Sequence, residues 1–65
     1  MSDYLSRIKK EKKELVDKLQ KLEDFVYSDD FAKLPDESKE LLFRQRTAMT
    51  DYRDVLAERI EFADT

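Results

Sequence analysis

The sequence predicts an all-α fold: an antiparallel hairpin of two long helices with a short connecting helical turn, assembled into a homo-oligomeric helical bundle. The 65 residues are 45% charged and 40% apolar, with no glycine and one proline, which is typical of long helices and coiled coils. Apolar residues recur at helical spacing in both halves of the chain. A polar segment that contains the proline separates the halves and predicts the corner.

The first helix is expected over about residues 3–27, on a row of apolar residues at alternating steps of three and four. Lys12 is the one polar residue in this row. It either sets the register or the oligomeric state, or its ammonium group leaves the row and lines a cleft between protomers. Opposite charges four residues apart, such as Lys10 with Glu14, are expected to pair on the outer faces. The row consists of Leu5, Ile8, Leu15, Leu19, Leu22 and Val26.

The corner is expected over about residues 28–35. Ser28 and the two aspartates after it favour caps and turns, and a single short helical turn fits here. Phe31 and Leu34 are apolar within this polar stretch, so we expect them to close the end of the hairpin. Pro35 suits the first position of the next helix.

The second helix is expected over about residues 36–63. Its apolar residues fall in three adjacent rows, a wider stripe than contact with one other helix needs. The rows are Leu41, Ala48, Val55 and Phe62; Leu42, Met49, Leu56 and Ala63; and Gln45, Tyr52 and Arg59. The surplus predicts contact with a second chain. Self-association also follows from size, because one domain of 65 residues without cysteine has few other means of stabilisation.

Composition excludes several classes of site. Without glycine there is no phosphate-binding loop, and without histidine or cysteine there is no thiolate nucleophile and no ordinary zinc site. Three carboxylate pairs are expected to be solvated caps or helix faces, although such pairs also bind metal ions. They are Asp29-Asp30, Glu23-Asp24 and Asp51-Asp54. We therefore expect no enzyme, no metal and no cofactor. Apolar runs are too short for a membrane span, and residues 1–10 do not form a signal peptide, so an intracellular soluble protein is expected.

The charges are segregated along the chain. Residues 7–21 hold seven basic and three acidic residues, whereas residues 28–65 hold six basic and ten acidic residues. A cationic strip on a protein of net charge −3 suits a compact anion better than DNA, which favours a basic domain overall. The alternative is a lysine-rich solvated face with pairs four residues apart.

Two groups of residues could recognise a nucleotide. Tyr4 lies one turn before Arg7, and an aromatic ring, a guanidinium group and a helix N-terminus together suit a base and its phosphate; alternatively, Tyr4 closes the end of the core. Tyr52, Arg53 and Arg59 form the second group. Here Tyr52 is expected in the core, and the arginines have nearby carboxylates as alternative partners.

The order of residues resembles a family of very small phage proteins that includes the anti-CBASS sponges. The resemblance covers nearly the whole chain. It is carried by Arg7-Ile8, Glu14-Leu15 and the run 21–26 in the first half, then by Phe31, Leu34, Leu41-Leu42, Gln45, Ala48-Met49, Tyr52, Leu56 and Arg59-Ile60.

This resemblance implies a compact helical homohexamer that binds cyclic dinucleotides between the N-terminal helices of paired protomers, and in some members cyclic trinucleotides at threefold sites. Sequestration would block host CBASS-type signalling in the cytoplasm of the infected bacterium, without catalysis. Tyr4 matches the aromatic residue that stacks on the bases. Lys18, or as second choice Lys12, matches the lysine that contacts phosphate, and Arg59 or Arg53 matches the trinucleotide site.

Two other hypotheses are compatible with the same residues. A structural coiled-coil oligomer or adaptor without a small ligand explains the apolar rows equally well. A basic amphipathic helix on a membrane surface is less favoured, because the apolar row of the first helix is needed for the core. We expect neither DNA nor membrane as a partner.

Overall fold

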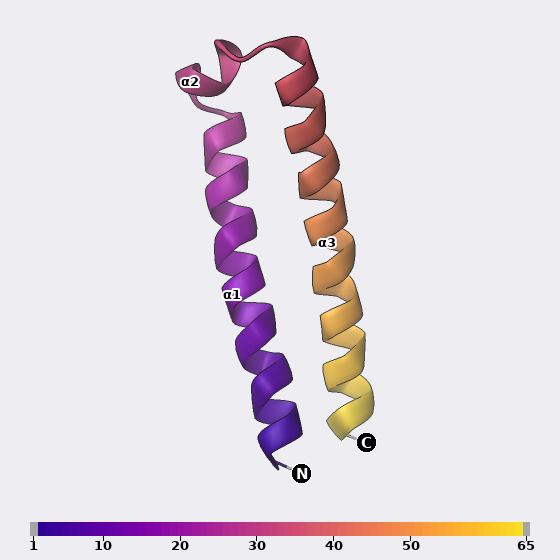
Figure 1. The fold of residues 1–65 in the computed structure, drawn as a ribbon. Coiled ribbons are helices and arrows are strands. Elements are labelled where there is room, and N and C mark those ends of the chain that lie inside the picture. The colour runs from indigo at the N-terminus through magenta and orange to yellow at the C-terminus, as the bar shows by residue number, and fades with distance from the viewer. Residues whose placement is uncertain (1, 65) are drawn as a thin grey trace.

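The computed structural model describes residues 2–64 as two long antiparallel helices joined by a short one (Figure 1). Helix α1 spans Ser2–Val26, α2 spans Asp29–Ala32 and α3 spans Asp36–Asp64. The long helices begin and end within two residues of the predicted positions. The predicted all-α hairpin is confirmed, whereas its assembly with further copies stays a prediction.

The core is a thin strip between α1 and α3. Its central cluster joins Ile8 and Leu15 of α1 to Leu56 of α3, with Met49 and Ile60 packed against it. Leu56 is fully buried, with 0% of its surface exposed. The predicted apolar row of α1 therefore faces α3, and its members at the two ends of the helix are half-buried.

The corner is closed by an aromatic cluster around Phe31, as predicted. The buried Phe31 ring meets Phe25 at 6.0 Å and Phe43 at 5.4 Å between ring centroids, both edge to face. Ser28 caps α2: its hydroxyl oxygen accepts a hydrogen bond from the Phe31 N–H, and its O–H donates to the Phe25 carbonyl. These contacts link α1, α2 and α3.

The sequence predicts Pro35 at the first position of the second helix, whereas α3 begins at the next residue. The Pro35 carbonyl accepts the backbone N–H of Lys39 at 3.1 Å, and α3 begins at Asp36. Pro35 therefore occupies the capping position before the helix, where a missing N–H has no consequence for the hydrogen bonds of α3.

The hairpin is long and thin, with principal extents of 47 × 15 × 13 Å and a radius of gyration of 14.8 Å. A compact domain of this length has a radius of about 11 Å. The accessible surface is 5258 Å², against about 4,400 Å² for a folded monomer of this mass. The surplus of about 900 Å² is close to one side of a standard protein interface.

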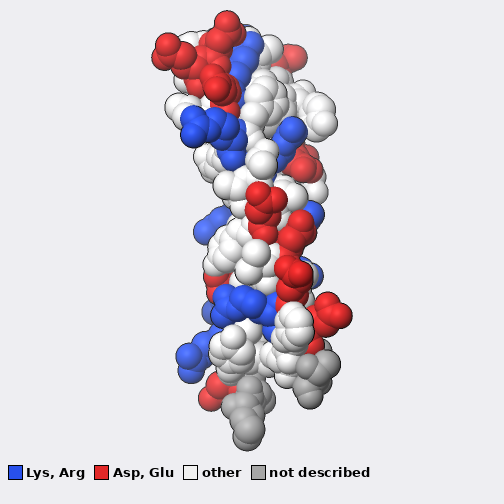
Figure 2. Space-filling view, turned by 90° about the vertical axis from the view of Figure 1, so that its right-hand side faces the viewer, with Lys and Arg blue, Asp and Glu red and all other residues white. Residues whose placement is uncertain are grey.

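Several exposed apolar side chains belong to α3. Leu41 is 59% exposed and Val55 is 48% exposed, so the first predicted apolar row lies outside the two-helix contact. Tyr52 is 41% exposed, and its expected place in the core is wrong. Figure 2 shows the outward side of α3, where uncharged side chains alternate with charged ones along the hairpin.

The predicted pairs of opposite charges on α1 do not form. Among the side chains that the structure describes, the only ion pair within 4.0 Å joins Arg53 and Asp54 of α3. Within residues 3–63, therefore, no lysine of α1 has a carboxylate oxygen within 4.0 Å. In residues 2–64 no helix has the length and apolar character to cross a membrane.

Candidate functional site

Tyr4 and Arg59, two of the predicted site residues, meet at the open end of the hairpin. The Arg59 guanidinium donates from Nη2 to the Tyr4 hydroxyl oxygen at 3.4 Å. Its Cζ lies 5.9 Å from the centroid of the Tyr4 ring. The antiparallel course of α1 and α3 brings together these residues, which are 55 positions apart in the sequence.

The contact leaves the aromatic ring available to a ligand. Tyr4 is 53% exposed, so its expected alternative role, closing the end of the core, accounts for less than half of its surface. A flat base can stack on an exposed aromatic ring, and an arginine beside the ring offers donors to phosphate oxygens.

Arg59 is positively charged, as an arginine is at any cellular pH. The hydrogen bond to Tyr4 raises the pKa of Arg59, and the nearby negative charge of Glu11 adds a smaller effect in the same direction. Both effects favour the charged form of the guanidinium group.

Arg7 and Lys18 share the flank of α1 that carries Tyr4, but at different distances. Arg7 is one turn from Tyr4 and exposed, so its side chain can approach a ligand on the ring. Lys18 is also exposed, but it lies four turns along α1, about 21 Å at 1.5 Å per residue. One protomer alone does not bring Lys18 to a small ligand on Tyr4.

Lys12 is half-buried and lines a surface hollow of about 410 Å³ between α1 and the end of α3. The other lining residues are Lys9, Lys13, Val16, Asp17 and Ile60. The sequence shows the basic segment but does not by itself mark Lys9 and Lys13 as site residues. Their spacing of four, on the same side of α1 as Lys12, was the available signal.

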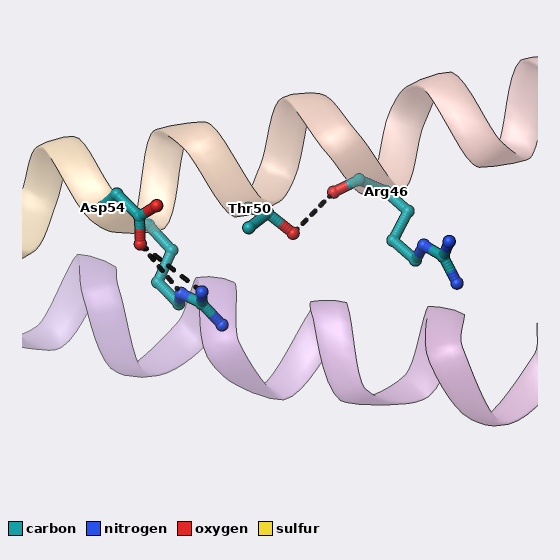
Figure 3. Close-up of polar contacts among 4 residues, drawn as sticks. Arg46, Thr50 and Asp54 are labelled. Carbon is teal, nitrogen blue, oxygen red and sulfur yellow. Dashed lines mark hydrogen bonds and ion pairs between the residues drawn. The ribbon is translucent and has the colours of Figure 1, made fainter.

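Arg53 is already engaged by a carboxylate. Its Nε and Nη2 both donate to Asp54 Oδ1 at 3.4 Å. Figure 3 shows this pair beside the bond from the Thr50 hydroxyl to the Arg46 carbonyl, which is 2.9 Å long. An exposed pair between neighbouring residues is weak, so an anionic ligand can displace Asp54 from Arg53.

Among the side chains of residues 3–63, no group of three or more potential metal ligands converges. Asp29 and Asp30 lie in the first turn of α2, where carboxylates are stabilised by the helix dipole. Asp54 pairs with Arg53.

A comparison with known protein families decides the identity of the chain. The family model named Sequestin matches residues 2–62. The chain belongs to the Sequestin family. Sequestin is the name of phage anti-CBASS cyclic-oligonucleotide sponge proteins, which confirms the resemblance read from the sequence. No curated protein and no solved structure matches the chain. The proteins of the Sequestin family are sponges, which bind their ligands and do not convert them.

Proposed function

We propose that the chain binds and sequesters cyclic oligonucleotide second messengers, cyclic dinucleotides above all and also cyclic trinucleotides, at interfaces between protomers. By withholding the messenger it blocks CBASS-type signalling in the cytoplasm of the infected bacterium, without catalysis. Membership of the Sequestin family supports this function, and the observation that carries it in the structure is the contact of Tyr4 with Arg59.

The distance between Tyr4 and Lys18 favours a site made by two protomers. A lysine four turns away reaches a ligand stacked on Tyr4 only if it comes from another copy of α1. A twofold interface presents each group twice. A cyclic dinucleotide has the matching near-symmetry, so two Tyr4 rings can meet its two bases and duplicate cations can meet its two phosphates.

The exposed surface supports self-association. The surplus of about 900 Å² over a compact monomer and the exposed row on α3 that includes Leu41 and Val55 leave apolar area for contacts between copies. We propose a homohexamer as the functional assembly.

Contacts of these kinds would contribute substantially to binding. Stacking contributes about 1–3 kcal/mol for each base, and each hydrogen bond to a charged group contributes about 1.5–3 kcal/mol. Two stacked bases with two to four charged contacts at the phosphates approach the roughly 12 kcal/mol that corresponds to nanomolar affinity. Tight binding matters because the dissociation constant sets how much messenger stays free while binding sites are still available.

Isothermal titration calorimetry against a panel of cyclic di- and trinucleotides tests the proposal, together with native mass spectrometry of the assembly. We expect Tyr4→Ala to weaken binding of a cyclic dinucleotide by a factor of about ten or more, because a stacked base is lost. Tyr27→Ala is the matched control, since Tyr27 is 83% exposed and follows the end of α1 at the corner. It should leave both affinity and mass unchanged.

Other results would change the interpretation. If the protein is an intact oligomer and no member of the panel gives a heat of binding, the structural coiled-coil oligomer is favoured and the sponge function is refuted. If Tyr4→Ala dissociates the oligomer while Tyr27→Ala does not, Tyr4 is a packing residue and the proposed site is wrong.

The roles of Arg53 and Arg59 are distinguished by the same assay with a cyclic trinucleotide. Arg59→Ala and Arg53→Ala each remove one positive charge, but only Arg59 touches Tyr4. We expect Arg59→Ala to weaken binding of both ring sizes. An effect of Arg53→Ala that is confined to the trinucleotide would assign Arg53 to a separate site.

A further inference from the structure

The hollow at Lys9, Lys12 and Lys13 lies apart from the contact of Tyr4 with Arg59. Lys13 is nine residues after Tyr4, about two and a half helical turns, so the two side chains leave α1 on opposite sides. On α3, Ile60 of the hollow follows Arg59 directly, which turns it about 100° away from the Tyr4 flank. A ligand in this hollow therefore does not share the surface of the Tyr4 ring.

The hollow is strongly positive. Three of its lining residues are lysines, and Asp17 is its one lining carboxylate. Within residues 3–63, none of the three ammonium groups has a carboxylate oxygen within 4.0 Å. Like charges that line one hollow repel one another, and an anion bound among them relieves that repulsion.

The position of Lys12 connects the hollow to the fold. Lys12 stands in the apolar row of α1, four residues after the buried Ile8 and three before the buried Leu15. A polar residue there costs stability. Its half-buried side chain lines the hollow. The polar residue that interrupts the apolar row is therefore one of the three lysines of the hollow.

The lining also contains apolar surface from both long helices. Val16 of α1 is 39% exposed and Ile60 of α3 is half-buried. Cations beside an exposed apolar patch match a ligand with phosphates and a flat organic ring, and the volume of about 410 Å³ suits a small ligand.

We propose that this hollow is a second nucleotide-binding site of each protomer, in which Lys9, Lys12 and Lys13 hold the phosphate groups and Val16 and Ile60 contact the base. The proposal rests on the proposed function only for the choice of nucleotides as ligands. The same chemistry fits a linear nucleotide or a cyclic one, and the two are distinguished by experiment.

Amide NMR spectra of the whole protein test the proposal, with ADP, cyclic di-AMP and inorganic pyrophosphate as probes. We expect ADP to shift the resonances of residues 9–17 and Ile60, both in the wild type and in Tyr4→Ala. If cyclic di-AMP shifts the same resonances in Tyr4→Ala, the hollow also accepts the cyclic ligand. ADP shifts confined to Tyr4 and Arg59, or absent at millimolar ADP, would overturn the proposal without affecting the sponge function.

Charge-reversal variants test the lysines. The double substitution Lys9→Glu with Lys13→Glu should weaken ADP binding by about tenfold or more, since each charged contact is worth that much. The control is Lys21→Glu with Lys33→Glu, which changes the net charge equally at exposed positions outside the hollow. An equal loss in the control would show a long-range effect of net charge and would refute the site.

The apolar contact has its own test. Val16→Ser should weaken ADP binding severalfold and leave pyrophosphate binding unchanged, because pyrophosphate has no base. Equal affinity of the wild type for ADP and pyrophosphate would refute the assignment of the hollow to nucleotides.

Discussion

Replacing Phe31 by alanine should destabilise the hairpin more than any change at an exposed aromatic residue. The Phe31 ring is 8% exposed and touches Phe25 of α1 and Phe43 of α3. A buried phenylalanine truncated to alanine costs about 3–5 kcal/mol. Phe31→Leu retains apolar burial but loses the two edge-to-face contacts, each worth about 0.5–1.5 kcal/mol, so we expect a loss of about 1–3 kcal/mol.

Urea denaturation followed by circular dichroism at 222 nm measures these differences. All variants are compared at one protomer concentration, because dissociation of an oligomer contributes to the apparent stability. Tyr27→Ala is the control and should change the free energy of unfolding by less than about 0.5 kcal/mol. The importance assigned to the aromatic corner is wrong if Phe31→Ala costs no more than Tyr27→Ala.

Four further predictions follow from single contacts. Leu56→Ala should lower the free energy of unfolding by about 2–5 kcal/mol in the same assay, because Leu56 is fully buried. Ser28→Ala should cost about 1 kcal/mol through loss of the cap of α2; no change would mean that α2 does not support the corner. Lys12→Leu should stabilise the hairpin by about 1 kcal/mol while weakening ADP binding, and unchanged binding would exclude Lys12 from the hollow. Because the pKa of Arg59 is raised, its guanidinium group stays charged and contributes to ligand binding at every pH below that pKa, and this contribution is lost only as pH rises through it. The chain has no histidine, so the calorimetric affinity for a cyclic dinucleotide should be constant from about pH 6 to about pH 8.

The helices and the corner could be predicted because their signals are local. The spacing of Ile8, Leu15 and Leu19 defines the buried face of α1, and Ser28, Phe31 and Pro35 mark the end of one helix and the start of the next. These patterns depend on residues within one or two turns of each other, where the geometry of the backbone is fixed by the helix.

The contact of Tyr4 with Arg59 was harder to predict because it depends on the register between the helices. The sequence contains a usable signal: Tyr4 stands 27 positions before Phe31, and Arg59 stands 28 positions after it. In an antiparallel hairpin, residues at equal distances from the corner lie opposite each other. By this rule the sequence places Tyr4 opposite Arg59, although the family resemblance matches the two residues to different ligands.

The failures concern side chains on the surface. The expected pair of Lys10 with Glu14 does not form, because exposed pairs gain little energy and restrict two long side chains. Tyr52 lies on the flank of α3 rather than in the core, since a strip of contact between two helices covers only one side of each. Such outcomes depend on partners that one chain's periodicity does not specify.

The placement of Tyr4 and Arg59 has a practical consequence for handling the protein. Helix α1 begins and α3 ends at the same end of the hairpin, the end that holds these two residues (Figure 1). An affinity tag or fluorescent fusion attached to either terminus would crowd the aromatic ring and compete for its arginine. Immobilisation through a cysteine introduced at Lys33, beyond α2 at the far end, would leave that surface clear.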